Sequence, residues 1–120
     1  MSVFQFVANG ALPIQKKVAA STPIVIVDAT DNIIIVPWFE VNDNAGGTQT
    51  LTVDIHDGTN TYYPGSDGAT ATIWRVKAVT ANQSVKFTQG YVIQKGSQLR
   101  VTSGDALGKF DVIGVKQVVP

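Results

Sequence analysis

The sequence predicts an all-β domain, an antiparallel β-sandwich of jelly-roll type with about eight or nine short strands. Runs of β-branched and aromatic residues recur along the chain, and clusters of Gly, Pro, Asn and Asp separate them. No long stretch has the 3.6-residue apolar spacing of an amphipathic helix. The length of 120 residues fits a single domain.

The N-terminal part of the chain consists of two short apolar segments. Residues 3–7 predict a short strand, and Pro13 stands near the start of the next segment. Because proline cannot donate a hydrogen bond to a neighbouring strand, Pro13 restricts this second segment to an edge strand or an extended arm. The predicted organisation is therefore an N-terminal strand or extended arm over residues 1–17, followed by a β-sandwich domain over residues 18–120.

Two strongly β-branched runs come next, at residues 23–27 and 33–41. The second run is apolar without alternation over its first half, which is typical of a strand buried on both faces. Pro37 within this run predicts a β-bulge or an edge position, because it lacks a backbone N–H.

Residues 48–63 predict a β-hairpin, the clearest local signal in the chain. Its first strand alternates strictly, with one buried set and one solvated set: Leu51, Val53 and Ile55 inward, and Thr50, Thr52 and Asp54 outward. The reversal falls at residues 57–60, where Gly58 and Asn60 tolerate the positive φ of a tight turn. Tyr62 and Tyr63 begin the return strand, and one of the two should face outward because adjacent strand residues point to opposite faces.

The remaining strands are short, and turn residues bound each of them. They are predicted at residues 72–79, 84–88, 91–93, 98–102 and 110–118. A series of short strands without intervening helices favours a sandwich over a mixed α/β fold.

Charge and composition exclude several functional classes. The chain has 9 Lys and Arg, 9 Asp and Glu, a formal net charge of zero and no cysteine. The lack of cysteine excludes disulfides, thiolate metal sites and cysteine nucleophiles, and the lack of a basic excess argues against nucleic-acid binding. The N-terminus does not have the basic and apolar regions of a signal peptide, and no apolar stretch is long enough for a membrane-spanning helix, so no membrane partner is expected.

The chemistry-bearing residues do not form a catalytic or metal-binding pattern. His56 is the single histidine, and Asp54 and Asp57 are its acidic neighbours in the sequence. Calcium is a weaker alternative for the loop aspartates, since Asp and Asn also favour turns through hydrogen bonds to their own backbone. The glycines do not form a phosphate-binding loop. The sequence therefore predicts a non-enzymatic protein without catalytic residues, metal or cofactor.

Four aromatic residues are the candidate partner-binding residues. Phe4 and Phe6 lie in the N-terminal apolar segment, and Tyr62 and Tyr63 follow the hairpin turn. Aromatic side chains on a β-sandwich surface contact protein partners or stack on sugars. Partner contact is the preferred interpretation, and sugar binding is the alternative.

Four segments together resemble the small, jelly-roll-like β-sandwich structural proteins of tailed-phage virions. They are the small polar loop at residues 42–47, the strand and turn ending in Tyr-Tyr at residues 51–63, the Gly-x-x-Leu-x-Val strand at residues 96–101, and the Asp-Val-x-x-Val strand at residues 111–115. The resemblance extends from about residue 12 to residue 118. The chain departs from it in a longer insertion at residues 64–69 and in the N-terminal segment.

The resemblance implies a structural role in the virion. Such proteins are capsid decoration or cement proteins that bind the major capsid protein or another virion protein, and they commonly form homotrimers. Residues 2–17 would suit an extended arm that grips the lattice. The alternative that the resemblance leaves open is a tail, neck or fibre module with receptor or carbohydrate recognition.

Overall fold

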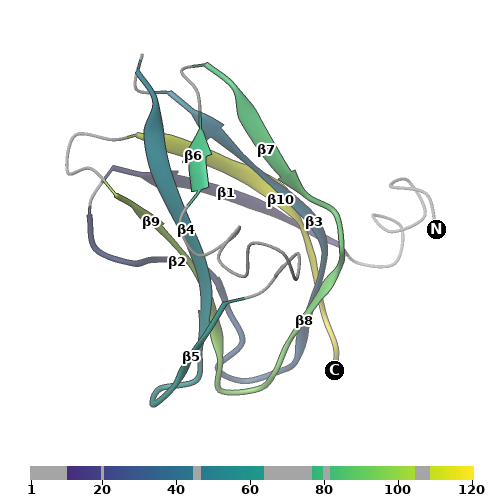
Figure 1. Ribbon diagram of the computed structural model, residues 1–120. Helices are drawn as coiled ribbons and strands as arrows, with labels where there is room; N and C mark the ends of the chain where they lie inside the picture. Colours follow the sequence, from purple (N-terminus) through teal and green to yellow (C-terminus); the bar gives the residue numbers. More distant parts are fainter. Residues whose placement is uncertain (1–10, 20, 45–46, 64–76, 80–81, 105–108) are drawn as a thin grey trace.

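The computed structural model describes residues 11–19, 21–44, 47–63, 77–79, 82–104 and 109–120. Within these residues the chain forms ten strands and no α-helix (Figure 1): β1 Leu12–Val18, β2 Ile24–Asp28, β3 Ile34–Asp43, β4 Gln49–His56, β5 Thr61–Tyr62, β6 Lys77–Val79, β7 Ser84–Phe87, β8 Tyr91–Ile93, β9 Gln98–Ser103 and β10 Phe110–Val118. A helix that could span a membrane is not found in this described part of the chain. The predicted all-β class is confirmed.

The strands form two antiparallel sheets with jelly-roll order. Sheet A runs β1-β10-β3-β7, with β8 also paired to β3, and sheet B runs β2-β9-β4-β5, with β6 also paired to β4. The first strand therefore pairs with the last and the second with the penultimate, and the middle strands close the series, as in a jelly roll. The ten described strands slightly exceed the predicted eight or nine, and β7 and β8 both pair with β3 while β5 and β6 both pair with β4.

The core lies between the two sheets and is almost entirely aliphatic and aromatic. Phe39 and Phe87, opposite each other on β3 and β7, are stacked with ring centroids 4.4 Å apart. Gly114 lies across from Phe39 on β10, where an added Cβ would stand 2.8 Å from the Phe39 Cβ. The Phe39 side chain therefore occupies space that a glycine neighbour leaves open, and larger residues at position 114 would collide with it.

The prediction that the strand at residues 33–41 is buried on both faces is wrong for β3. Its residues alternate between buried and half-buried positions, so one face packs in the core and the other lies at the outer surface of sheet A. The predicted bulge at Pro37 is confirmed, because the pairing of β3 with β10 shifts between Trp38 and Ile35. Pro37 also lies between the residues that pair with β8 and those that pair with β7, where a missing N–H is tolerated.

Strand β1 is an edge strand of sheet A, paired to β10 along its whole length. Ile14, within the predicted N-terminal segment, and Val18, just after it, are both buried in the core, so residues 12–17 form part of sheet A. Residues 1–10, which include Phe4 and Phe6, lie outside the described residues. The division between residues 1–17 and 18–120 stays a prediction.

Candidate partner-binding surface

The β4–β5 hairpin forms as predicted, and Asp57 holds its turn. Ile55 pairs with Tyr62 and His56 with Thr61, and the Asp57 N–H donates to the Asn60 carbonyl at 3.1 Å. The Asp57 carboxylate accepts the backbone N–H groups of residues 59 and 60 at 2.9 Å and 2.6 Å. Gly58 has a φ of 94°, and Asn60 does not share this positive φ. A turn with glycine at its first central position matches the right-handed twist of the two strands.

Both tyrosines after the turn are exposed, where the alternation predicted one. The exposed fraction is 52% for Tyr62 and 40% for Tyr63. Strand β5 contains only two residues and lies at an edge of sheet B, so Tyr63 falls beyond the last paired position. The Tyr62 hydroxyl donates to Asp57 Oδ2 at 3.2 Å, which fixes its ring against the turn.

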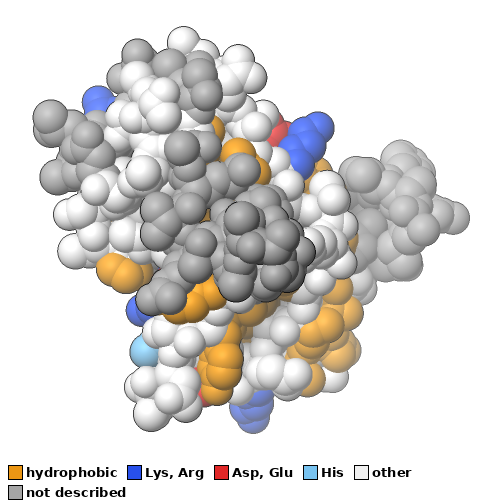
Figure 2. All heavy atoms as spheres, viewed as in Figure 1, with side chains coloured by type: hydrophobic (Ala, Val, Ile, Leu, Met, Phe, Trp, Pro, Cys, Tyr) orange, Lys and Arg blue, Asp and Glu red, His pale blue; other side chains and the backbone are white. Residues whose placement is uncertain are grey.

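A groove of about 400 Å³ runs between this hairpin and the β8–β9 connection, and we call it the hairpin groove. Tyr62 lines it from the hairpin, and Val92, which is 57% exposed, lines it from β8. Strands β5 and β8 reach the same end of the sandwich in Figure 1, and hydrophobic side chains are exposed at that end in Figure 2. The remaining residues that line the hairpin groove are Ile55, Asp57, Gln94, Lys95 and Ser97.

His56 is not arranged for catalysis. Its Nδ1 lies 3.0 Å from the Thr61 hydroxyl across the hairpin. Both nearby carboxylates are engaged elsewhere, Asp57 with the turn and Asp54 with Arg100. Among the described residues, no group of three or more His, Cys, Asp or Glu could hold a metal ion. Asp57 therefore serves the backbone geometry of the turn, and Asp54 serves an ion pair between strands.

The prediction that this side of β4 faces solvent is wrong at Asp54. It is 4% exposed, although its position in the alternation is on the solvent side. Arg100 lies directly across on β9, and its Nε donates to Asp54 Oδ1 at 2.7 Å. A cross-strand partner of opposite charge allows this carboxylate to be buried, because the ion pair replaces water around it. The sequence carried no signal for this pair, since the two residues are far apart along the chain.

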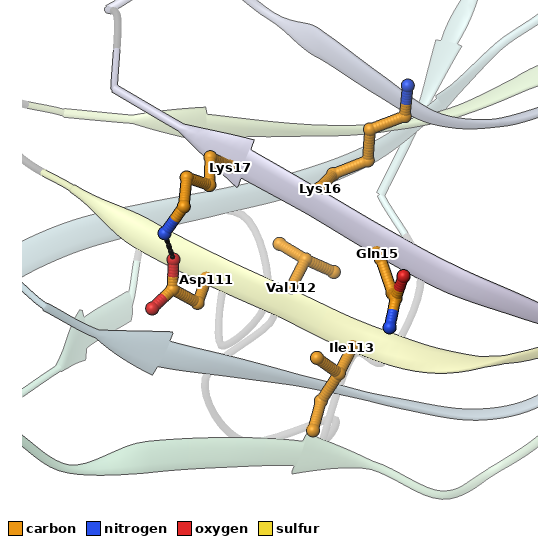
Figure 3. Close-up of a pocket in the computed structure, with 6 residues that line it drawn as sticks. All are labelled: Gln15, Lys16, Lys17, Asp111, Val112 and Ile113. Atoms are coloured by element: carbon orange, nitrogen blue, oxygen red, sulfur yellow. Dashed lines mark hydrogen bonds and ion pairs between the residues drawn. The ribbon is translucent and has the colours of Figure 1, made fainter.

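A second hollow, of about 430 Å³, lies on the outer side of sheet A over β1 and β10 (Figure 3). Lys17 and Asp111 form an ion pair of 2.7 Å at one end of it. Gln15 and Ile113, which face each other in register, lie at the other end, and Ile113 is 48% exposed. The hollow is therefore lined by a charged pair and an exposed apolar side chain on the outer side of sheet A.

The Asp57 turn gives the hairpin a testable dependence on pH. Hydrogen bonds from the Asn60 and Thr59 N–H groups, reinforced by the Tyr62 hydroxyl, lower the pKa of Asp57 below its ordinary value. A lowered folded-state pKa contributes stability above the unfolded-state pKa, near 4, and loses it as the pH falls through the folded-state value. We expect the difference in unfolding free energy between wild type and Asp57→Asn to shrink as the pH falls from neutral into this range, measured by chemical denaturation. A difference that is constant with pH would contradict this assignment.

Comparisons with known proteins identify no family. No family model matches the chain, and no curated protein matches it significantly. Two solved structures similar to it are each described as a pentameric capsid protein isolated from metagenomic phage sequences. The first is 21% identical with a TM-score of 0.43 over 89% of this chain, and the second is 18% identical with a TM-score of 0.43 over 99% of it. The chain spans 60% of the length of the first and 77% of the second, and a likeness at this level carries no argument about function.

Proposed function

We propose that this chain is a non-enzymatic structural protein of a phage virion, a decoration or cement protein that binds the capsid lattice. The observation that carries the proposal is the pair of exposed tyrosines on a hairpin whose turn is fixed by Asp57. The sequence resemblance to phage virion proteins supports the virion setting. The jelly roll is compatible with this role, but many unrelated functions use the same fold.

The hairpin groove supplies the features of a protein-binding anchor. Aromatic side chains carry much of the energy of protein interfaces, and a ring that is already held loses little entropy on binding. The bond from Tyr62 to Asp57 holds the ring in this way, and Val92 adds exposed apolar surface to the lining. In the proposed role, this groove receives a side chain or loop of the capsid protein and adds contact area across neighbouring subunits.

Binding to capsids that lack the protein tests this proposal. Wild-type protein is expected to co-sediment with such capsids, and Tyr62→Ala is expected to weaken binding by at least about tenfold, the loss of a modest interface hot spot. Tyr62→Phe is the matched control. It keeps the ring and removes the bond to Asp57, so it separates the contribution of the ring to binding from that of the bond. A copy number comparable to that of the major capsid protein, from mass spectrometry of purified virions, supports capsid decoration. A folded wild-type protein that binds neither capsids nor tails would overturn the proposal.

The second candidate is a tail, neck or fibre module that recognises a receptor carbohydrate. The observation that favours it is the exposed Tyr62 ring beside the Asp57 carboxylate, because sugars stack on aromatic faces and donate hydroxyls to carboxylates. Binding on a glycan array that is lost in Tyr62→Ala and Tyr63→Ala would favour this candidate over capsid decoration. A low copy number in purified virions would point the same way.

A further inference from the structure

The outer face of sheet A, turned away from sheet B, carries a row of apolar residues. The strand registers place Pro13, Val115 and Trp38 side by side across β1, β10 and β3. Ile113 lies two residues along β10 on the same face. We call these four residues the apolar strip. A sheet face that meets water normally carries polar side chains at such positions.

The strip is accessible from outside the sandwich. Ile113 is 48% exposed and Pro13 is exposed, whereas Trp38 and Val115 are half-buried. Phe39 and Val112, the strand neighbours of Trp38 and Ile113, are buried in the core, so the strip residues point the other way. A contiguous apolar surface that combines a half-buried tryptophan with exposed apolar side chains marks a contact surface.

The acidic residues next to the strip each have a basic neighbour. Lys17 is paired to Asp111 at 2.7 Å, and Glu40 lies across from Lys86 on β3 and β7. Among the described residues, the face therefore carries no isolated carboxylate that would favour a basic partner, and its centre is apolar. An uncharged, apolar segment is the occupant that fits it.

We propose that the occupant is the N-terminal segment of a second copy of this chain, with residues 3–7 bound on the apolar strip. No charged side chain precedes Lys16, and residues 3–7 read Val-Phe-Gln-Phe-Val. Strand β1 begins at Leu12 on the edge of this same sheet, so the preceding segment is attached at the border of the strip. Ten extended residues reach about 33 Å at roughly 3.3 Å each, which is comparable to the 39 × 33 × 28 Å body.

The attachment point favours a second copy over the segment's own copy. To cover its own strip, the segment would have to reverse sharply out of the plane of sheet A just before Leu12. An in-plane hairpin at Asn9-Gly10 would bring it to the β1 edge, where Pro13 lacks the N–H that strand pairing uses. We therefore assign the strip to the segment of a second copy.

The proposed contact joins two different surfaces, and this determines the kind of assembly. A segment that binds a strip is a heterologous contact, which closes into a ring when the rotation between copies allows it. The predicted homotrimer is one such ring. The contact holds whether or not the protein is part of a virion, so it goes beyond the proposed function.

Cysteine cross-linking tests the contact directly, because the chain has no cysteine of its own. Full-length Phe4→Cys and full-length Ile113→Cys, mixed under mild oxidation, are expected to form a disulfide-linked dimer. The matched control pairs Phe4→Cys with Tyr62→Cys, whose side chain is as exposed but lies in the hairpin groove. Failure of the first pair to cross-link, or equal cross-linking of the control, would overturn the proposal.

Sedimentation velocity separates docking on a second copy from docking on the same copy. The wild type is expected to form a closed oligomer, whereas Ile113→Lys and the double variant Phe4→Ser/Phe6→Ser each remain monomeric with wild-type melting temperatures. A mixture of these two variants is expected to form heterodimers, because it contains one intact segment and one intact strip. A monomeric wild type, or a mixture that stays monomeric, would refute the proposal. Tyr62→Ala, which tests capsid attachment, is expected to leave the oligomer intact.

Discussion

Replacement of Phe39 with alanine is expected to lower the free energy of unfolding by about 3–5 kcal/mol, the usual cost of removing a buried phenylalanine. The Phe39 side chain is fully buried, stacks on Phe87 at 4.4 Å and lies across from Gly114. Its ring therefore occupies the space where β3, β7 and β10 meet. Alanine would leave a cavity that these strands cannot easily close, because each is held by its neighbours in the sheet. Urea denaturation of the two proteins measures the difference.

A graded series shows whether the loss follows the cavity. Phe39→Leu retains most of the side-chain volume, and it should lower the free energy of unfolding clearly less than Phe39→Ala does. Phe87→Ala removes the other ring of the stack and should cost an amount similar to Phe39→Ala. Equal losses for the leucine and alanine variants would show that ring contact, and not volume, dominates at this position.

Replacement of Arg100 with alanine is expected to cost about 3–5 kcal/mol, because it leaves a buried carboxylate without its partner. The side chains of Arg100 and Asp54 are 18% and 6% exposed, and Nε and Oδ1 are 2.7 Å apart. In the folded variant, the Asp54 carboxylate stays buried on β4 without its partner. Urea denaturation of the two proteins measures the loss.

The surface pair Lys17–Asp111 provides a matched control at the same distance. Its atoms are also 2.7 Å apart, but its side chains are 81% and 36% exposed. Lys17→Ala is expected to change the unfolding free energy by less than about 1 kcal/mol, as is typical of solvated ion pairs. The double variant Arg100→Met/Asp54→Leu should recover most of the stability lost in Arg100→Ala, since apolar groups can replace a buried pair. Equal losses at Lys17 and Arg100 would contradict the role assigned to burial.

Local sequence patterns were sufficient where the structure depends on local chemistry. Strand β10 covers the predicted residues 110–118, and the turn at Gly58 forms as its composition indicates. Pro37 marks the predicted irregularity in β3 because a proline removes a ladder hydrogen bond in any sheet. Phe4, Phe6, Tyr62 and Tyr63 all stay predictions as partner-binding residues, and the structure places Tyr62 and Tyr63 on the surface.

Errors occurred where a side chain's environment depends on a distant strand. The alternation around Asp54 predicts that its side chain is exposed to solvent, because nothing near it in the sequence indicates that Arg100 lies opposite. The unbroken apolar run in β3 predicts burial on both faces, whereas its second face forms the outer side of sheet A. The apolar strip follows from the same fact, since Pro13, Trp38 and Val115 become neighbours only when three strands pair.

The sequence by itself determined the β class, most strand positions and the hairpin, because alternation and turn residues act over a few neighbouring positions. The tertiary structure alone decided the two sheets, the pairing of the first strand with the last, and the surfaces that result from it. Pairing in a jelly roll joins residues from opposite ends of the chain, and one register sets which side chains meet across it. The hairpin groove and the apolar strip are products of that pairing.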